Sequence, residues 1–238
     1  MIKEALKYVV GLSEPFIENL NGRIFSDKAL EEVVTERYAD SFALTTLSSL
    51  VEYIKVNVES MKGYMFVHVQ SPTKVQVFST LDFFRKREYV VNVYANLPEI
   101  TTNRFIDRET FNIALQSKFE ETTDKTLLLK FVGTVEEGTV QEYGDDGVTQ
   151  KATIKTGIAS RGDAIVPNPV VLKPYRTFTE VEQPESAFVF RMKSDRCGGV
   201  ECAIFEADGG AWKNKAMENV KAYLKEALKD VEGYTIIS

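Results

Sequence analysis

Three β-prone runs follow one another between Met61 and Ala95, and they constrain the fold more than any other part of the chain. The runs are YMFVHV, KVQVFST and REYVVNVYA. Ser71-Pro72 separates the first two, and Leu81–Lys86 separates the second from the third. Connections this short join antiparallel neighbours, because parallel strands need a crossover of a dozen or more residues. The stretch therefore predicts an antiparallel meander.

Amphipathic helices are predicted on both sides of this meander. Before it, Thr45 and Thr46 can cap a helix whose apolar residues recur at helical spacing, namely Leu47, Leu50, Val51 and Ile54. After it, Asp107 can cap the segment RETFNIALQSKF, and a second helix is predicted over Lys125–Val132. The tight link between these two helices predicts an αα-hairpin.

The ends of the chain add further hairpins and a long helix. A helix over Ile2–Val10 and a hairpin centred on Asn21-Gly22 are predicted near the N-terminus. A hairpin signature at Gly144–Gly147 precedes the strand candidates VVLKPYRTF, SAFVFRM and VECAIFEA. Gly209-Gly210 then opens an amphipathic helix that runs to about Lys229, and YTII forms a last strand.

These elements define the α+β class. We expect mainly antiparallel sheets of hairpins and meanders, with the αα-hairpin in mid-chain and the long C-terminal amphipathic helix packed on a sheet. The chain has no internal repeat or long linker, so it is interpreted as a single domain over 1–238, or as two lobes over 1–133 and 137–238.

Charge and composition narrow the function classes. The net charge of −6 argues against sequence-blind nucleic-acid binding unless a local basic patch overrides it. Apolar runs stay far below the roughly 20 residues of a membrane span, and the first residues are too charged for a signal peptide. We therefore expect a cytoplasmic protein without a membrane partner. Cys197 and Cys202 have neither zinc-ligand spacing nor the numbers for a disulfide framework.

The common catalytic motifs are missing. The chain lacks the nucleophile elbow, the zincin helix, the phosphate-binding P-loop and the dinucleotide-binding glycine pattern. Its single histidine, His68, shares one strand face with Tyr64 and Phe66, which predicts a structural side chain against the core or at its edge. This pattern favours a protein that is not an enzyme and that uses no metal or cofactor.

Carboxylates cluster twice near the C-terminal helix. Glu206 and Asp208 leave a strand end on the same side, and Glu180, Glu182 and Glu185 lie upstream. Together they could bind Mg²⁺ through oxygen ligands. The favoured interpretation is structural: Asp208 caps the helix, and Glu206 pairs with an arginine, Arg176 or Arg191.

Two groups of residues are candidate binding sites. The first would bind a small anionic ligand and consists of Arg176, Arg191, Lys151, Lys155 and Glu206. The second interleaves basic and aromatic residues, as single-stranded nucleic acid requires, and consists of Phe84, Arg85, Lys86, Arg87 and Tyr89, next to Phe83. The alternative for the second group is a solvated hairpin tip whose aromatic side chains point inward.

Three segments carry a family resemblance: DDGVTQKATIKTGIA, VPNPVVLKPYRTFTEVEQPESAFVFRM and ECAIFEADGGAWKNKAMENVKAYLKEAL. Together they resemble the YfdQ-like family of uncharacterised phage and prophage proteins. The resemblance implies a bacteriophage or prophage origin and the cytoplasm of a bacterial host, and it implies no activity.

Four functions follow from these observations. The leading hypothesis is a non-enzymatic phage accessory protein that forms a homo-oligomer and binds a small nucleotide-like anion or a host or phage protein. The alternative is a single-stranded nucleic-acid-binding protein of a phage replication or recombination module. A virion structural protein comes next, and a metal-dependent hydrolase comes last.

Overall fold

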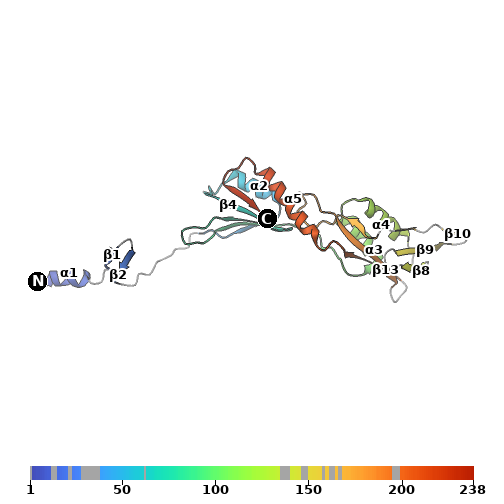
Figure 1. The fold of residues 1–238 in the computed structure, drawn as a ribbon, viewed down its shortest axis with the longest axis horizontal. Helices are drawn as coiled ribbons and strands as arrows, with labels where there is room; N and C mark the ends of the chain where they lie inside the picture. The colour runs from blue at the N-terminus through green and yellow to red at the C-terminus, as the bar shows by residue number, and fades with distance from the viewer. Residues whose placement is uncertain are drawn as a thin grey trace. The chain divides into compact units, whose positions relative to one another are not determined.

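The computed structural model shows two compact units, Met1–Tyr38 and Ala39–Ser238 (Figure 1). The residues that it describes are 2–11, 15–20, 23–27, 38–61, 63–134, 140–145, 150–156, 159–160, 164–165, 168–194 and 199–238. Among them, no helix is both long enough and apolar enough to cross a membrane. The helices and mainly antiparallel strands confirm the predicted α+β class.

The smaller unit contains one helix and one hairpin. Helix α1 spans Ile2–Gly11, and strands β1 (Ile17–Leu20) and β2 (Arg23–Ser26) pair antiparallel. The predicted Asn21-Gly22 turn itself lies outside the described residues. None of the residues of α1 is buried, although the helix is amphipathic.

A five-stranded sheet forms the first half of the larger unit. Its strands, in spatial order, are β15 (Tyr234–Ile237), β4 (Met65–Ser71), β5 (Lys74–Ser79), β6 (Tyr89–Tyr94) and β3 (Phe42–Leu44). The central three strands form the predicted antiparallel meander. The two outer strands pair parallel to their neighbours and come from distant parts of the chain.

Two helices pack on one face of this sheet. Helix α2 (Leu47–Val56) and helix α5 (Ala211–Ala227) contribute Leu50, Ile54, Val220 and Leu224 to a core that also contains the valines of β4, β5 and β6. The caps follow the sequence: Thr46 Oγ1 accepts a hydrogen bond from Ser49 N at 3.2 Å, which satisfies one free backbone donor of α2.

The second half of the larger unit is built on a four-stranded antiparallel sheet. Its order is β12 (Val170–Leu172), β13 (Ser186–Ser194), β14 (Val200–Glu206) and β7 (Ile106–Asp107). Helices α3 (Arg108–Lys118) and α4 (Thr123–Thr134) form the predicted αα-hairpin and bury Phe111, Leu115 and Phe131 against one face of the sheet. Asp107 caps α3 by accepting from Thr110 N at 2.8 Å.

The predicted strand VVLKPYRTF is shorter than expected. Strand β12 ends at Leu172, and the chain then leaves the second sheet, because Pro174 cannot donate a ladder hydrogen bond. Phe178 and Val181 are buried in the core of the first sheet. The segment after β12 therefore connects the two cores instead of extending a sheet.

A small third sheet lies between α4 and β12 in the sequence. It consists of β8 (Val140–Asp145), β9 (Gln150–Thr156), β10 (Ala159–Ser160) and β11 (Ala164–Ile165). Strands β8 and β9 pair antiparallel, as the hairpin signature predicts.

Candidate nucleic-acid interface

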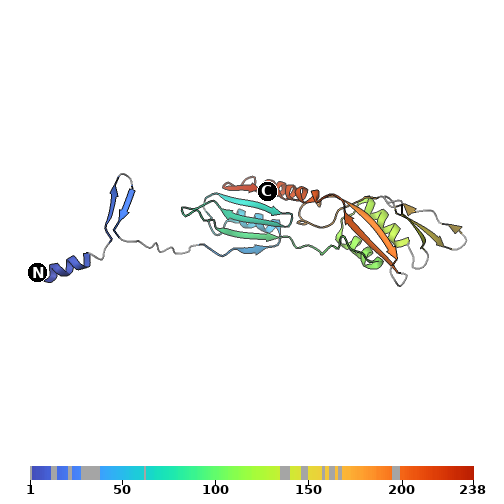
Figure 2. The ribbon, with the colours of Figure 1, turned by 60° about the horizontal axis from the view of Figure 1, so that its bottom comes forward.

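One face of the five-stranded sheet has no helix of the larger unit packed on it among the described elements. Helices α2 and α5 both lie on the opposite side, and Figure 2 looks onto the uncovered face. Strand β4 explains the choice of face: Met65, Val67 and Val69 are buried under the helices, and the alternate residues Phe66 and His68 are half-buried on the other side. The uncovered face thus carries the aromatic half of the alternation.

The strand register aligns the outward side chains in rows. In an antiparallel or parallel pair, directly opposed residues share a face. The first row runs across β15, β4, β5 and β6 and consists of Thr235, Phe66, Phe78 and Tyr89. The second row runs from β15 to β3 and consists of Ile237, His68, Gln76, Asn92 and Ala43. The face therefore has an aromatic row beside a polar row.

The aromatic rings of these rows contact one another. The centroid of Phe78 lies 5.5 Å from that of Phe66 and 5.5 Å from that of Tyr89. The His68 ring meets Phe78 edge-on at 6.2 Å. Tyr89 is 48% exposed, so part of this ring surface is open to solvent. Such spacings are typical of favourable ring pairs, and the exposed rings can accept further stacking partners.

Cations accompany the rings. The guanidinium of Arg87 lies 5.6 Å from the Phe66 centroid and 5.2 Å from the Phe78 centroid, and its Nη1 donates to Ser79 O at 3.0 Å. Lys74 Nζ lies 5.3 Å from the ring centroid of Tyr94. These are cation–π distances, and they hold positive charge at the sheet surface.

The five strands of this sheet contain no Asp or Glu, although the chain has 35 acidic residues. The acidic net charge of the protein therefore does not extend onto the sheet surface. Arg87 and Lys74 therefore face no carboxylate from the strands, and two acidic residues, Asp82 and Glu88, lie in the β5–β6 connection, where their carboxylates accept from Lys86 N and Ala39 N.

Amides occupy the middle of the polar row. Gln76 Nε2 donates to Asn92 Oδ1 at 2.7 Å, and Asn92 Nδ2 donates to Ser41 Oγ at 3.1 Å. This chain of hydrogen bonds fixes the orientation of both amides on the sheet. Fixed amides next to stacked rings can form hydrogen bonds with the edge of a base.

The β5–β6 connection adds exposed aromatic side chains beside the sheet. Phe83 is 93% exposed and Phe84 is 48% exposed, and their rings meet at 87° with 5.3 Å between centroids. The alternative in which these aromatic side chains point inward is therefore wrong for Phe83. The loop is held by Asp82, whose Oδ1 accepts from Lys86 N at 2.7 Å, and by the left-handed conformation of Arg85 (φ 60°).

The structure thus distributes the predicted nucleic-acid residues over two places. Arg87 and Tyr89 lie on the sheet face, and Phe84, Arg85 and Lys86 lie in the adjoining loop. Phe66, Phe78 and Lys74 were missed, and His68 was assigned to the core or its edge. The sequence did contain a signal for these residues. In YMFVHV and KVQVFST, aliphatic residues on one face alternate with aromatic and polar residues on the other, and the aliphatic face is the one expected to be buried in the core.

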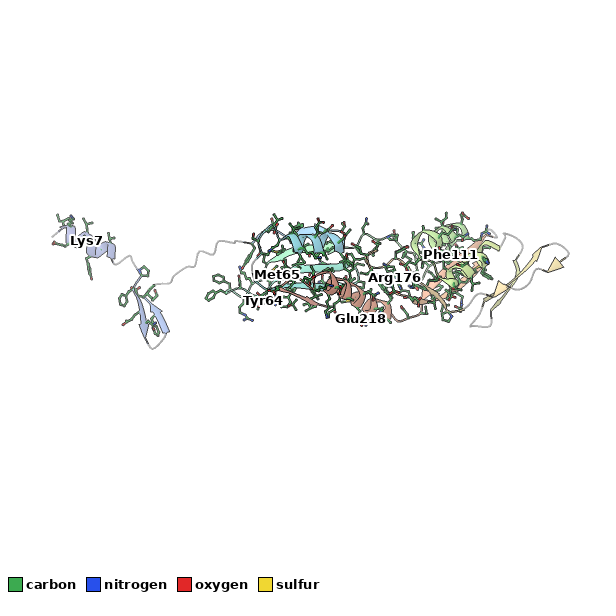
Figure 3. All side chains as sticks on the ribbon, turned by 90° about the horizontal axis from the view of Figure 1, so that it is seen from above. Lys7, Tyr64, Met65, Phe111, Arg176 and Glu218 are labelled. Atoms are coloured by element: carbon green, nitrogen blue, oxygen red, sulfur yellow. The ribbon has the colours of Figure 1, made fainter. Side chains whose placement is uncertain are left out.

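Arg176 lies elsewhere, at the junction between the two cores of the larger unit (Figure 3). It is 9% exposed, and its Nη1 donates to Glu206 Oε1 at 2.9 Å. Its Nη2 donates to Ser186 Oγ, which in turn donates to Asp208 Oδ2 at 2.7 Å. The guanidinium stacks on the Trp212 ring at 3.9 Å. The predicted pairing of Glu206 with an arginine is confirmed, with Arg176 as the partner.

Charges at this junction are balanced locally. Burial alone would raise the pKa of Asp208, but hydrogen bonds from Ser186, Gly210 N and Trp212 N and the charge of Arg176 outweigh it, so the pKa of Asp208 lies below its ordinary value. Burial lowers the pKa of Arg176, and the charges of Glu206 and Asp208 offset part of this effect. An arginine nevertheless stays protonated at any ordinary pH.

Neighbouring residues anchor the same segment to both cores. Gln183 Oε1 accepts from Arg176 N at 2.9 Å, and Thr177 Oγ1 donates to Pro72 O at 2.5 Å in the β4–β5 turn. Glu180 Oε1 accepts from Leu47 N at 2.8 Å at the start of α2, where the helix dipole favours a negative charge. The carboxylate clusters therefore take structural partners. Among the described residues, no three His, Cys, Asp or Glu side chains come together as metal ligands would.

The small-anion candidates whose side chains the structure describes, Arg176, Glu206 and Arg191, do not share one site. A pocket of about 230 Å³ lies beside Arg176, but the Glu206 carboxylate forms part of its wall. Arg191 lies on the face of the second sheet that points away from the core of α3 and α4, and its Nη1 donates to Phe190 O at 2.8 Å. Lys151 and Lys155 lie on β9, and their side chains are outside the described part of the chain.

The described cysteine, Cys202, gives no reactive site. Cys202 is a buried free thiol in the second core, and burial raises its pKa to about 12. Such a thiol is inert as a nucleophile at neutral pH. Cys197 lies outside the described residues.

Comparison with protein-family models, with curated proteins and with solved structures gives no match.

Proposed function

We propose that this chain is a non-enzymatic protein that binds single-stranded nucleic acid on the uncovered face of its five-stranded sheet. One observation carries the proposal: Phe66, Phe78 and Tyr89 form a contiguous row of rings beside the cations Arg87 and Lys74, on strands that contain no carboxylate. Rings and cations on one groove or sheet face are the combination that sequence-tolerant single-strand binders use.

Each part of the face has a role in this proposal. Exposed bases stack on Tyr89 and on the accessible parts of Phe78 and Phe66, which contributes about 1–3 kcal/mol per base. Arg87 and Lys74 contact phosphates. The loop aromatics Phe83 and Phe84 extend the surface that bases can contact. A duplex would bind poorly, because its bases are already stacked and face inward.

The small-anion hypothesis has less support. Its central residue, Arg176, already forms an ion pair with Glu206, and the charge of Asp208 also acts on it. An added anion would therefore be repelled by two carboxylates. The resemblance to the YfdQ-like phage and prophage family remains the only support for a bacteriophage accessory role in a bacterial cytoplasm. Within such a setting, we place the protein in a replication or recombination module, where single strands are exposed.

Self-association is a second property that a specific observation favours. Ile2, Leu6, Val9 and Val10 of α1 are each at least 59% exposed, which is unusual for the apolar side of an amphipathic helix. We propose that this helix side packs against another copy of the chain in a homo-oligomer. Leu6→Ser should then lower the mass measured by light scattering, and Lys7→Ser should not; equal masses for all three proteins would contradict the proposal.

Fluorescence anisotropy with a labelled oligothymidine of about 20 nucleotides tests the main proposal, since one single-strand-binding module covers about 4–16 nucleotides. The double variant Phe66→Leu/Phe78→Leu keeps apolar side chains and removes the rings. We expect it to weaken binding about tenfold or more, the equivalent of at least one lost stacking contact.

The salt dependence isolates the phosphate contacts. Each phosphate contact to a single strand adds about 0.7 to the slope of log affinity against log salt. Arg87→Gln should reduce the slope by about that amount. Lys225→Gln, which removes an equal charge from α5 on the covered side, should leave it unchanged. If neither Phe66→Leu/Phe78→Leu nor Arg87→Gln changes oligonucleotide binding, the proposal is wrong.

A protein partner on the same face would give another result. If the wild-type chain binds no oligonucleotide and Phe66→Leu/Phe78→Leu converts an oligomer to a smaller species, the face is a subunit interface and the nucleic-acid proposal is wrong.

A further inference from the structure

The outer edge of β15 carries backbone groups without hydrogen-bond partners. Strand β15, drawn in red, lies at one edge of the first sheet (Figure 2). At its start, Gly233 O accepts from Met65 N at 2.8 Å. Alternate residues of a parallel strand bond to the same neighbour, so Thr235 is also bonded to β4. The N–H and C=O groups of Tyr234 and Ile236 therefore point to the open edge, and no described residue forms a hydrogen bond with them.

This edge lacks the charges, prolines and bulges that keep exposed strands apart. Natural proteins place such features on edge strands because an unprotected edge pairs with another chain. The sequence of β15 is YTII, without a charged residue or a proline, and its pairing with β4 has no register shift. Thr235 is exposed, on the uncovered face of the sheet. The edge is thus a template for a further strand.

A second copy of the same edge fits this template. Two copies of β15 related by a two-fold axis run antiparallel to each other. When Thr235 lies opposite Thr235 of the second copy, the outward groups of Tyr234 meet those of Ile236. This register pairs every outward group of both strands. With the axis at Tyr234 or at Ile236, only the residue on the axis would pair with its counterpart.

Charges at the ends of the strands are complementary in this register. Thr235 is the midpoint between Glu232 and Ser238, so Glu232 of one copy comes to the end of β15 of the other. There, Lys221 Nζ from α5 donates to Ser238 Oγ at 3.0 Å. Glu232 is exposed. The carboxylate of each copy therefore lies near an ammonium group of the other, and no like charges oppose each other along the edge.

The same register joins the uncovered faces of the two copies. Directly opposed residues share a face, and Thr235 belongs to the row that contains Phe66, Phe78 and Tyr89. With Thr235 on the two-fold axis, the row continues through Thr235 of the second copy to its three rings. The two aromatic rows become one row on a sheet of twice the width.

We infer that β15 pairs antiparallel with β15 of a second copy, and that the chain forms a homodimer with one sheet continuous across the two-fold axis. This contact is separate from the one proposed for α1. The pairing itself does not depend on the proposed function. Its consequence for ligand binding rests on that function: the nucleic-acid site spans both copies, so a long single strand contacts the rings of both.

Disulfide crosslinking of the full chain tests the pairing. Opposed side chains of an antiparallel pair have Cβ atoms about 4.5–5.5 Å apart, close to the separation in a disulfide. Thr235→Cys in a Cys197→Ser background should therefore oxidise to a linked dimer. Ala43→Cys is the matched control, because Ala43 is exposed on β3 at the other edge of the same sheet. Equal yields from the two variants, or no linked dimer from Thr235→Cys, would overturn the inference.

Light scattering measures the pairing without a crosslink. The Leu6→Ser background removes the association proposed for α1. In this background, Thr235→Lys places like charges opposite each other at the axis and should reduce the mass from that of two chains to that of one, 26.8 kDa. Ala43→Lys should leave the mass unchanged, and thermal melting shows that both variants are folded. A Leu6→Ser protein that is already a monomer, or a dimer that Thr235→Lys does not dissociate, would contradict the inference.

Oligonucleotide binding separates this inference from the proposed function. At concentrations where the reduced protein is monomeric, the linked Thr235→Cys dimer should bind an oligothymidine of about 24 nucleotides more tightly than the reduced protein does, and one of about 6 equally well. Equal affinities for the longer strand would refute the shared site. If the linked dimer forms and no oligonucleotide binds, the proposed function fails and the pairing stands. If oligonucleotides bind and no linked dimer forms, the proposed function stands and the inference is wrong.

Discussion

Arg176→Met should destabilise the protein more than any exposed substitution, because Arg176 joins the two cores of the larger unit. Methionine retains most of the apolar contact with Trp212 and Phe188 but removes the charge that balances Glu206 and Asp208. It also removes the Nη2 group that donates a hydrogen bond to Ser186 Oγ. The variant thus tests the ionic part of the junction rather than its packing.

The magnitude follows from the burial of the two partners. Removing one partner of a fully buried ion pair costs about 3–5 kcal/mol. The Arg176 side chain is 9% exposed, but that of Glu206 is 33% exposed, so water compensates part of the lost interaction. We therefore expect about 2–3 kcal/mol, which for a domain of this size corresponds to a decrease in Tm of about 5–10 °C.

Calorimetry or circular dichroism of the full chain measures the effect, with Lys215→Met as the control. Lys215 is on the same helix as Trp212 and its side chain is 61% exposed, so its replacement should change the free energy of unfolding by less than about 0.5 kcal/mol. Glu206→Gln completes a double-mutant cycle, in which we expect a coupling of about 1–2 kcal/mol with Arg176→Met. If Arg176→Met melts within about 1 °C of the wild type, the junction is not held by this ion pair.

Three further predictions follow from the same contacts. The pKa of Asp208 is below its ordinary value in the folded protein, so the ionised carboxylate stabilises the fold fully above the unfolded pKa of about 3.9, and this stabilisation is lost as pH falls through the folded pKa. The difference in Tm between wild type and Asp208→Asn should therefore be largest near pH 7 and shrink below about pH 4. A difference that stays constant with pH would contradict this. Leu50→Ala removes a fully buried side chain between α2 and the first sheet and should cost about 2–5 kcal/mol in chemical denaturation, whereas a cost below about 1 kcal/mol would argue against this core. Phe83→Ser, at the most exposed aromatic side chain among the described residues, should leave Tm unchanged and weaken oligonucleotide binding about three- to tenfold, and unchanged affinity would remove the loop from the site.

Local patterns predicted most of the elements. The meander, the αα-hairpin, the caps at Thr46 and Asp107 and the C-terminal helix all follow from spacing, turn residues and capping chemistry within about 20 residues of chain. The parallel pairing of β3 with β6 and of β15 with β4 was not predicted, because it depends on which distant segment reaches each edge of the meander.

The binding face was only partly predictable for a related reason. Period-two alternation separates the two faces of β4, but it does not say which face a helix from elsewhere in the chain will cover. The helices cover the valine face, and His68 and Phe66 are consequently on the open side. The sequence did identify Arg87 and Tyr89, because their basic and aromatic character is visible without knowing the sheet.

The Arg176–Glu206 pair illustrates the opposite case. The sequence analysis named both residues as candidates for a small-anion site and expected Glu206 to pair with Arg176 or Arg191. An anion site, however, requires that Arg176 be accessible to a ligand. In the structure Arg176 is buried and contacts Ser186 and Trp212, and Ser186 in turn donates to Asp208, so the ion pair lies in the junction between the two cores. Residue type identified the interaction, and only the tertiary arrangement revealed its surroundings.

Photocrosslinking measures most directly where a single strand contacts the protein. An oligothymidine carrying 5-iodouracil bases would be bound to the full chain, irradiated and digested, and the crosslinked peptides identified by mass spectrometry. The account predicts crosslinks at Phe66, Phe78 and Tyr89, competed by unlabelled single strand and not by duplex. Crosslinks confined to α3 and α4, or to the covered side of the first sheet, would contradict it.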